Sequence, residues 1–142
     1  MLTLAIIKPD ALAANNAGKI LAHLEAQGFR VRAARLTRLT TPQAEAFYAV
    51  HKERPFFRSL VTFMTSGPCM PLALERAEAV AALREAIGAT DPAEAKAGTI
   101  RKLYAQSKEK NAIHASDSAE NAAREVAFFF PEMELAASAT TG

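Results

Sequence analysis

The chain has 142 residues, of which 50% are hydrophobic and 23% are charged. This length and composition are typical of a folded chain, so we expect a single domain over residues 1–142. The formal net charge is only +2, from 17 basic and 15 acidic side chains. That balance argues against a nucleic-acid coat protein and against any specific binding of nucleic acid.

The sequence favours a cytoplasmic location. Its single cysteine, Cys69, cannot form an internal disulfide and lacks the Cys and His neighbours of a zinc site, which is typical of a reducing compartment. No apolar run approaches the roughly 18 residues that span a membrane. The first eight residues carry no basic leader, so we expect neither a signal peptide nor membrane association.

The first part of the chain alternates strands and helices. Residues 2–7 form an apolar run that predicts a buried strand. Apolar positions from Ala17 recur with helical spacing, and Gly28 is expected to end that helix. Residues 29–40 then alternate, with Phe29, Val31 and Ala33 on one side, which predicts a strand with one solvated face.

The middle of the chain is expected to be mainly helical. Thr41 and Pro42 predict a helix start, with threonine as the cap. A second short helix is predicted over residues 56–65, followed by a strand over 70–74. A helix over 77–87 should end at Gly88.

The last part of the chain contains the clearest helix. Residues 89–111 show no regular pattern, and an irregular stretch of that length is usually functional. An apolar stripe predicts a helix from Ala119 to Phe130, ended by Pro131, and residues 136–142 are expected to fray. This order of elements fits an α/β (α+β) domain with a ferredoxin-like split βαβ fold. We expect a four-stranded antiparallel sheet covered by helices on one face.

Glycine-rich phosphate-binding motifs are absent from the sequence. Gly18-Lys19 resembles the end of a P-loop, but Ala13 and Ile20 stand where the motif needs glycine and Ser or Thr. No G-x-G-x-x-G occurs either. A nucleotide, if bound, would therefore be held by side chains.

His114 is the first candidate for chemistry, because it precedes the clearest helix. A helix N-terminus favours an anion, and neutral imidazole accepts and releases phosphate near pH 7. Glu125 lies off the apolar stripe of that helix and could hold one imidazole nitrogen while the other attacks. The alternatives are a structural histidine and a glutamate that only solvates its helix.

Phosphoryl transfer also needs positive groups around the moving oxygens, and Lys8, Arg84 and Arg101 are candidates. Each cation alone is equally compatible with an ordinary surface. The basic and aromatic cluster at residues 51–58 resembles nucleic-acid binders, but the balanced charge disfavours that interpretation.

Six short segments carry a resemblance to a known family. They occur in the family's order and spacing, and they are Ile7-Lys8-Pro9-Asp10, Arg54-Pro55-Phe56-Phe57, Met64-Thr65-Ser66-Gly67-Pro68, Gly88-Ala89-Thr90-Asp91-Pro92, Gly98-Thr99-Ile100-Arg101 and Asn111-Ala112-Ile113-His114-Ala115-Ser116-Asp117-Ser118. From Leu4 to about Glu134 the chain resembles the nucleoside diphosphate kinases. The resemblance implies a ferredoxin-like homo-oligomer that uses Mg²⁺ and transfers phosphate from a nucleoside triphosphate to a diphosphate by a ping-pong mechanism.

The resemblance also implies roles for single residues. His114 would be phosphorylated through Nδ1, with Glu125 and Ser116 steadying it. Phe56 would stack on the base, and Asp117 would touch the metal through water while the nucleotide phosphates hold it. The residues that would bind phosphates and ribose are Lys8, Tyr48, Arg84, Thr90, Arg101 and Asn111.

Two positions depart from the family pattern. Ala115 stands where the family usually has glycine, and a positive φ there would cost alanine roughly 1 kcal/mol. Lys108 stands where an apolar residue often faces the base across from Phe56. The alternative to an active kinase is a weakened homologue that binds nucleotides for regulation. Phe128 and Phe129 give apolar surface for a second subunit. The short tail after Leu135 resembles that of bacterial members of the family, and this resemblance favours a tetramer over a hexamer.

Overall fold

The computed structural model describes residues 1–139, so the expectation for residues 140–142 lies outside the described part. Within it, no helix is long and apolar enough to cross a membrane. The elements in chain order are β1 (Leu2–Ile7), α1 (Pro9–Ala13), α2 (Ala17–Ala26), β2 (Arg30–Ala34), α3 (Thr41–Phe47), the 3₁₀ turn η1 (Ala49–His51), α4 (Phe57–Met64), β3 (Met70–Glu75), α5 (Ala79–Ile87), α6 (Ile100–Tyr104), β4 (Ile113–Ala115), α7 (Ala119–Phe129) and α8 (Glu132–Ala139).

The four strands form one antiparallel sheet in the order β2-β3-β1-β4. β1 lies in the interior of the sheet, where its apolar run is buried from Leu4 to Ile7. β4 is short and pairs along the other side of β1, with Ile6 opposite His114. The expected four-stranded ferredoxin-like sheet is confirmed.

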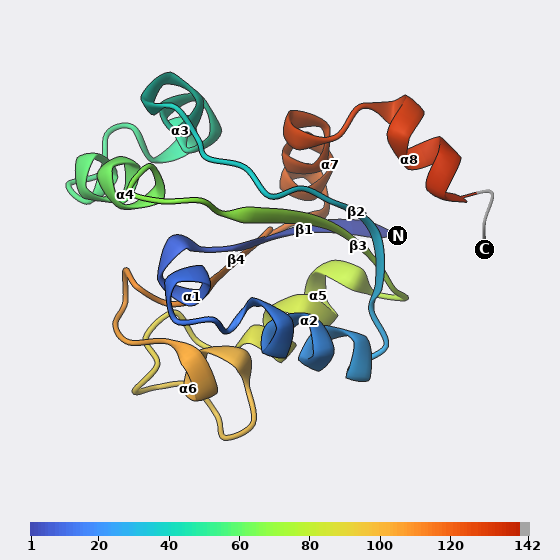
Figure 1. Cartoon of the computed structure of the whole chain (residues 1–142), viewed down its shortest axis with the longest axis horizontal. Helices are drawn as coiled ribbons and strands as arrows, with labels where there is room; N and C mark the ends of the chain where they lie inside the picture. Colours follow the sequence, from blue (N-terminus) through green and yellow to red (C-terminus); the bar gives the residue numbers. More distant parts are fainter. Residues whose placement is uncertain (140–142) are drawn as a thin grey trace.

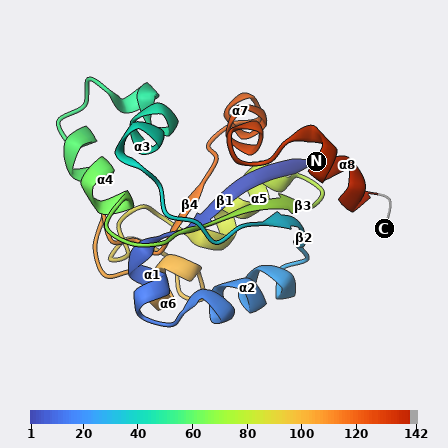
Figure 2. The same cartoon turned by 45° about the horizontal axis from the view of Figure 1, so that its top comes forward.

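Helices cover both faces of the sheet, so the expectation of one covered face is wrong. Figures 1 and 2 show α3, α4, α7 and α8 on one side and α1, α2, α5 and α6 on the other. Two apolar cores result, and alternate residues of β1 contribute to each. Leu4 and Ile6 pack toward Phe47 and Val126, while Ala5 and Ile7 belong to the core of the opposite face. A sheet buried on both sides needs strands that are apolar at every position.

β2 is shorter than expected and is interrupted by a β-bulge. Its pairing with β3 shifts register between Val31 and Ala33. Because a bulge inserts one residue, side chains beyond it change faces. Val31 therefore packs in the core with Phe29, whereas Ala33 lies in the core of the opposite face. The expectation that all three share one side fails at this point.

Helix ends follow local capping chemistry. The cap of α3 is Thr40 and not Thr41, since its hydroxyl accepts from the Gln43 N–H in a full capping box. Gly28 and Gly88 end their helices with φ near +89° and +88°. At Gly88 a Cβ would lie 2.6 Å from the Thr99 hydroxyl, so a side chain would displace the start of α6.

Three elements are too short to show a periodic pattern in the sequence. α1, α6 and β4 span few residues and were not expected. α8 occupies residues to Ala139, where fraying was expected from residue 136. Two arginines of the β2 region hold this C-terminal part, because Arg35 donates to the Phe129 carbonyl and Arg32 donates to the Leu135 carbonyl, both at 2.8 Å.

Candidate active site

His114 lies in the middle of β4, not at the mouth of a helix. Its place opposite Ile6 directs its side chain to the face that carries α3 and α7. α7 begins only at Ala119, where the hydroxyl of Ser118 caps it by accepting from the Asn121 N–H. The helix-terminus argument for His114 is therefore wrong, and the sheet positions this side chain instead.

Glu125 and Ser116 fix the ring of His114. The Nε2 atom lies 2.7 Å from Glu125 Oε1, and the Ser116 hydroxyl donates to the same oxygen at 2.8 Å. Glu125 comes from α7 and is 8% exposed, so the carboxylate lies beneath the imidazole and not in solvent. A carboxylate accepts only, so Nε2 carries the proton and Nδ1 keeps its lone pair. This arrangement leaves Nδ1 as the nucleophilic nitrogen.

Burial lowers the pKa of His114 from its usual value. The hydrogen bond and charge of Glu125 raise this pKa, while the charges of Lys8 and Arg101 lower it further. The net direction favours the neutral ring at pH 7. A neutral imidazole is the form that can attack phosphorus.

Two aromatic rings from the end of α3 flank the histidine. Phe47 meets the imidazole edge to face with 5.4 Å between ring centres, and the Tyr48 ring lies 6.2 Å away. The Tyr48 hydroxyl is buried and has no hydrogen-bond partner within residues 1–139. Burial raises the pKa of Tyr48, so this hydroxyl stays protonated and can donate.

Lys8 and Asn111 meet at the end of β1. The Lys8 ammonium donates to Asn111 Oδ1 at 2.8 Å, and both residues are buried. Burial, with help from the Arg101 charge, lowers the pKa of Lys8 to about 8. The Asn111 amide in turn donates to the carbonyls of Lys108 at 2.9 Å and Thr90 at 3.4 Å. Asn111 therefore ties Lys8 to the loop that contains Thr90.

Arg101 and Arg84 bring two more cations to the same region. The buried Arg101 donates to the carbonyls of Gly88 at 3.2 Å and Ile113 at 2.8 Å. Burial, and then the nearby Arg84 charge, lower the pKa of Arg101 to about 10. Arg84 is exposed and reaches the Ala115 carbonyl at 3.4 Å. Like charges held this close favour a bound anion.

Other expected site residues are exposed and loosely held. Phe56 is 47% exposed and contacts His51, with 5.4 Å between ring centres. Thr90 and Lys108 are also exposed. Asp117 accepts from the Asn121 amide at 2.7 Å, a bond that lowers the pKa of its carboxyl. Contacts and charge effects link the expected residues into one region, but no contact described here joins Phe56 to it.

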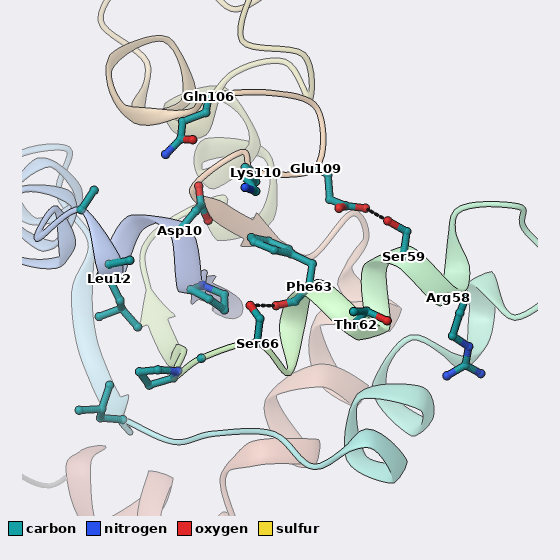
Figure 3. A pocket seen from close by; sticks show the side chains of 16 residues that line it. Asp10, Leu12, Arg58, Ser59, Thr62, Phe63, Ser66, Gln106, Glu109 and Lys110 are labelled. Atoms are coloured by element: carbon teal, nitrogen blue, oxygen red, sulfur yellow. Dashed lines mark hydrogen bonds between the residues drawn. The ribbon is translucent and has the colours of Figure 1, made fainter.

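A separate hollow lies away from His114. It is an open groove of about 1130 Å³ between α1, α4 and residues 106–110, and His114 does not line it. Figure 3 shows side chains that line this groove, among them Asp10 and Lys110, and the bond in which Glu109 accepts from the Ser59 hydroxyl. This groove is therefore distinct from the region around His114.

A family model described as nucleoside diphosphate kinase matches residues 2–135. The nucleoside diphosphate kinase of Chlorobium luteolum is 57% identical over 136 residues, which cover 96% of this chain and 97% of that protein. That of Sorangium cellulosum is 56% identical over 138 residues, 97% of this chain and 96% of that protein. The chain belongs to the nucleoside diphosphate kinase family.

Solved structures of the family share the fold. The enzyme of Aquifex aeolicus superimposes with a TM-score of 0.92 at 46% identity, covering 94% of this chain and 96% of that one. The Halobacterium salinarum enzyme, solved in complex with CDP, gives 0.90 at 36% identity, with 94% and 90% covered. The predicted family, its fold and its class of enzyme, a nucleotide phosphotransferase, are confirmed.

The structure removes the concern about Ala115, which departs from the family's usual glycine. Ala115 lies in β4, paired with Ala5, and is not among the non-glycine residues of 1–139 with positive φ. Those residues are Asn15, Glu78 and Ala112. The strained backbone therefore lies three residues earlier, at Ala112. Sequence reasoning missed this residue and its partner Asp10, although Asp10 belongs to one of the six family segments.

Proposed function

We propose that the protein transfers the γ-phosphoryl group of a nucleoside triphosphate, typically ATP, to a nucleoside diphosphate through a phosphohistidine at His114. The observation that carries this proposal is the hydrogen bond of 2.7 Å between His114 Nε2 and Glu125. It leaves Nδ1 of a largely buried, neutral imidazole without a proton, and the charges of Lys8 and Arg101 lie near enough to lower the pKa of the ring. A nucleophile near positive groups is what transfer of an anionic phosphoryl group requires.

The reaction proceeds as two in-line displacements. In the first, the lone pair of His114 Nδ1 forms a bond to the γ-phosphorus while the bond from that phosphorus to the bridging oxygen breaks. The nucleoside diphosphate leaves with that electron pair. In the second, a terminal oxygen of another nucleoside diphosphate attacks the phosphorus, and the N–P bond electrons return to Nδ1. One site serves both steps, which gives the ping-pong order.

Glu125 has a role in both steps. The attacking ring gains positive charge as the N–P bond forms, and the carboxylate under Nε2–H stabilises it. Ser116 donates to the same carboxylate oxygen and so fixes its orientation. The proton on Nε2 does not need to leave during the reaction.

The polar and cationic residues around His114 would bind the triphosphate. Lys8, Arg101, Arg84, Thr90 and the Tyr48 hydroxyl can each donate to phosphate oxygens or to the ribose. Asn111 would contact the ribose end and also hold Lys8 in place. Donors that are already oriented stabilise developing charge with little reorganisation.

Phe56 would stack on the nucleobase. Its exposed ring offers a face to any base, since stacking does not read hydrogen-bonding edges. The related Halobacterium salinarum enzyme was solved in complex with CDP, which supports a nucleoside diphosphate as the ligand of this fold.

Enzymes of this family use a divalent metal. Among residues 1–139, no three His, Cys, Asp or Glu side chains are grouped so that they could hold one. This fits Mg²⁺ that arrives on the nucleotide phosphates, with the carboxylate of Asp117 reaching it through water. Such an ion neutralises phosphate charge when bound.

We also propose a homo-oligomer, with a tetramer favoured over a hexamer. Phe129 does not support it, because this ring is buried in the chain's own core. Phe128 does, since it is 37% exposed beside Phe47. Light scattering coupled to size-exclusion chromatography measures the mass and would separate four chains from six or one.

Incubation with γ-labelled ATP tests the proposed reaction. We expect an acid-labile, alkali-stable label on the wild type that is lost on addition of a nucleoside diphosphate. The His114→Ala variant should carry none, while the His51→Ala variant, changed at a half-buried histidine beside Phe56, should still take the label. A folded wild type that binds nucleotide but takes no label would instead identify a regulatory homologue without turnover.

A further inference from the structure

Ala112 is the strained residue of the reactive segment. Its φ of 73° lies in the left-handed region that alanine rarely adopts. The two other non-glycine residues with positive φ among residues 1–139, Asn15 and Glu78, are exposed, whereas Ala112 is completely buried. A strained conformation in a packed interior persists only where the surroundings enforce it.

The turn at Ala112 is closed by its own bond, since the Ile113 N–H donates to the Asn111 carbonyl at 2.9 Å. Two further bonds come from residues 8–10, and Asp10 supplies one of them. The buried carboxylate accepts the backbone N–H of Ala112 through Oδ2 at 3.1 Å. The Ala112 carbonyl accepts the backbone N–H of Lys8 at 2.9 Å. The peptide groups on both sides of Ala112 are thus held by residues 8–10, which continue from the end of β1.

We call the two bonds from Asp10 and Lys8 to Ala112 the clamp. Because of the position of Ala112, the clamp affects the reactive groups. Asn111, directly before it, accepts from the Lys8 ammonium at 2.8 Å. His114, two residues after it, meets Glu125 at 2.7 Å. A change of φ at Ala112 would turn the segment before it relative to β4. Both contacts depend on that angle.

We propose that Asp10 is a positioning residue of the phosphoryl-transfer site, which holds Ala112 in the left-handed conformation and so sets Asn111 against Lys8 and His114 against Glu125. This inference rests on the proposed function of His114. It differs from a purely electrostatic role, in which the Asp10 charge would act on Lys8 without regard to the backbone.

Substitutions at both ends of the clamp test the proposal. The single-turnover rate of His114 phosphorylation by ATP should fall about tenfold or more in Asp10→Ala. It should stay within about threefold of the wild type in Asp10→Asn, because the amide oxygen can accept the same N–H. In an Ala112→Gly background, the loss caused by Asp10→Ala should shrink to less than about threefold, because glycine adopts positive φ without a clamp.

Three results would overturn the clamp. The first is an Asp10→Ala variant within about threefold of the wild-type rate. The second is an Asp10→Asn variant as slow as Asp10→Ala with no rescue by Ala112→Gly, which would assign the effect to charge. The third is an equal slowing in Leu21→Ala, which removes packing of α2 in the core of the opposite sheet face and serves as a control for lowered thermal stability.

Calorimetric binding of ADP to the same variants separates this inference from the proposed function. The clamp predicts weaker ADP binding in Asp10→Ala and recovery in the Ala112→Gly background, since Asn111 and Lys8 move together. If the wild type takes no label but the variants show this pattern of ADP binding, the phosphohistidine is overturned and the clamp stands. If the wild type is labelled but the variants lack the expected rates and ADP binding, only the clamp is overturned.

Discussion

The inner and outer parts of the site differ in how firmly they are held. The inner residues are largely buried and form two bonded sets, with distances of 2.7–2.8 Å: Glu125 with His114 and Ser116, and Lys8 with Asn111. The outer residues, which include Phe56, Thr90 and Arg84, are exposed and have few contacts. The inner part would supply the nucleophile and its nearest cation, whereas the outer part would contact the base through Phe56 and phosphate oxygens or the ribose through Thr90 and Arg84. The residues held most firmly are thus those around the nucleophile.

The largest loss is expected from Lys8→Met, which removes a buried cation and the partner of Asn111. We expect kcat/KM to fall by about 10²–10³, since one preorganised donor to a developing charge contributes that much. Steady-state kinetics with ATP and a nucleoside diphosphate measures it. Lys19→Met, at an exposed lysine of α2, is the matched control and should leave the rate unchanged. A loss below about threefold would mean that the inner part does not act on phosphate.

Glu125→Ala should cost about 10²-fold in the rate of phosphohistidine formation. It removes the acceptor of both His114 and Ser116, and misplacing a nucleophile by about an ångström has an effect of that order. Rapid-quench measurement of the labelled enzyme reports this step. Glu120→Ala, in the first turn of the same helix, is exposed and should behave as the wild type. Equal effects of the two variants would assign the loss to the helix and not to the contact.

A smaller loss, about tenfold in kcat/KM and mostly in KM, is expected from Phe56→Ala. Stacking contributes about 1–3 kcal/mol per base, and it should act on binding more than on transfer. Val50→Ala is a control at a neighbouring exposed position of η1. A fall in kcat as large as the rise in KM would show that the outer part also orients the phosphoryl group.

The smallest expected effect is a displacement of the pH profile. Attack requires neutral His114, and burial lowers the pKa of His114, so the acid limb of kcat/KM should lie below the usual histidine range. Glu125→Gln removes a charge that raises this pKa, and the limb should move to still lower pH. At the other end, activity should fall as pH rises through about 8, where Lys8 loses its proton. Titration of the substrate affects the wild type and Glu125→Gln equally. An acid limb at the same pH in both would therefore contradict its assignment to His114.

Much of the fold could be predicted because β1, β3 and α7 carry long apolar patterns. Coverage of both sheet faces was also readable in principle, since the runs in β1 and β3 are apolar at successive positions and do not alternate. The bulge in β2 could not be predicted, because an alternating pattern of residues carries no information about an inserted residue. β4 is too short to show any period.

For the site, resemblance to the family predicted which residues to examine but not how they are held. Lys8, Tyr48 and His114 come from three segments distant in sequence, and the antiparallel pairing of β1 with β4 brings the segment before Lys8 beside the segment that carries His114. The importance of Ala112 could not be predicted, because an alanine gives no sign of positive φ in its residue type. The opposite holds at Ala115, where the sequence suggested backbone strain. This residue lies in β4 and does not have a positive φ.

Cys69 offers a use that follows from its burial. The thiol is completely buried at the start of β3, and burial raises its pKa to about 11. It is the single cysteine of the chain, so in the folded state a thiol reagent should find almost no thiolate to react with. Labelling of the unmodified protein would therefore record how often this edge of the core opens, with the wild-type sequence serving as its own probe of local unfolding.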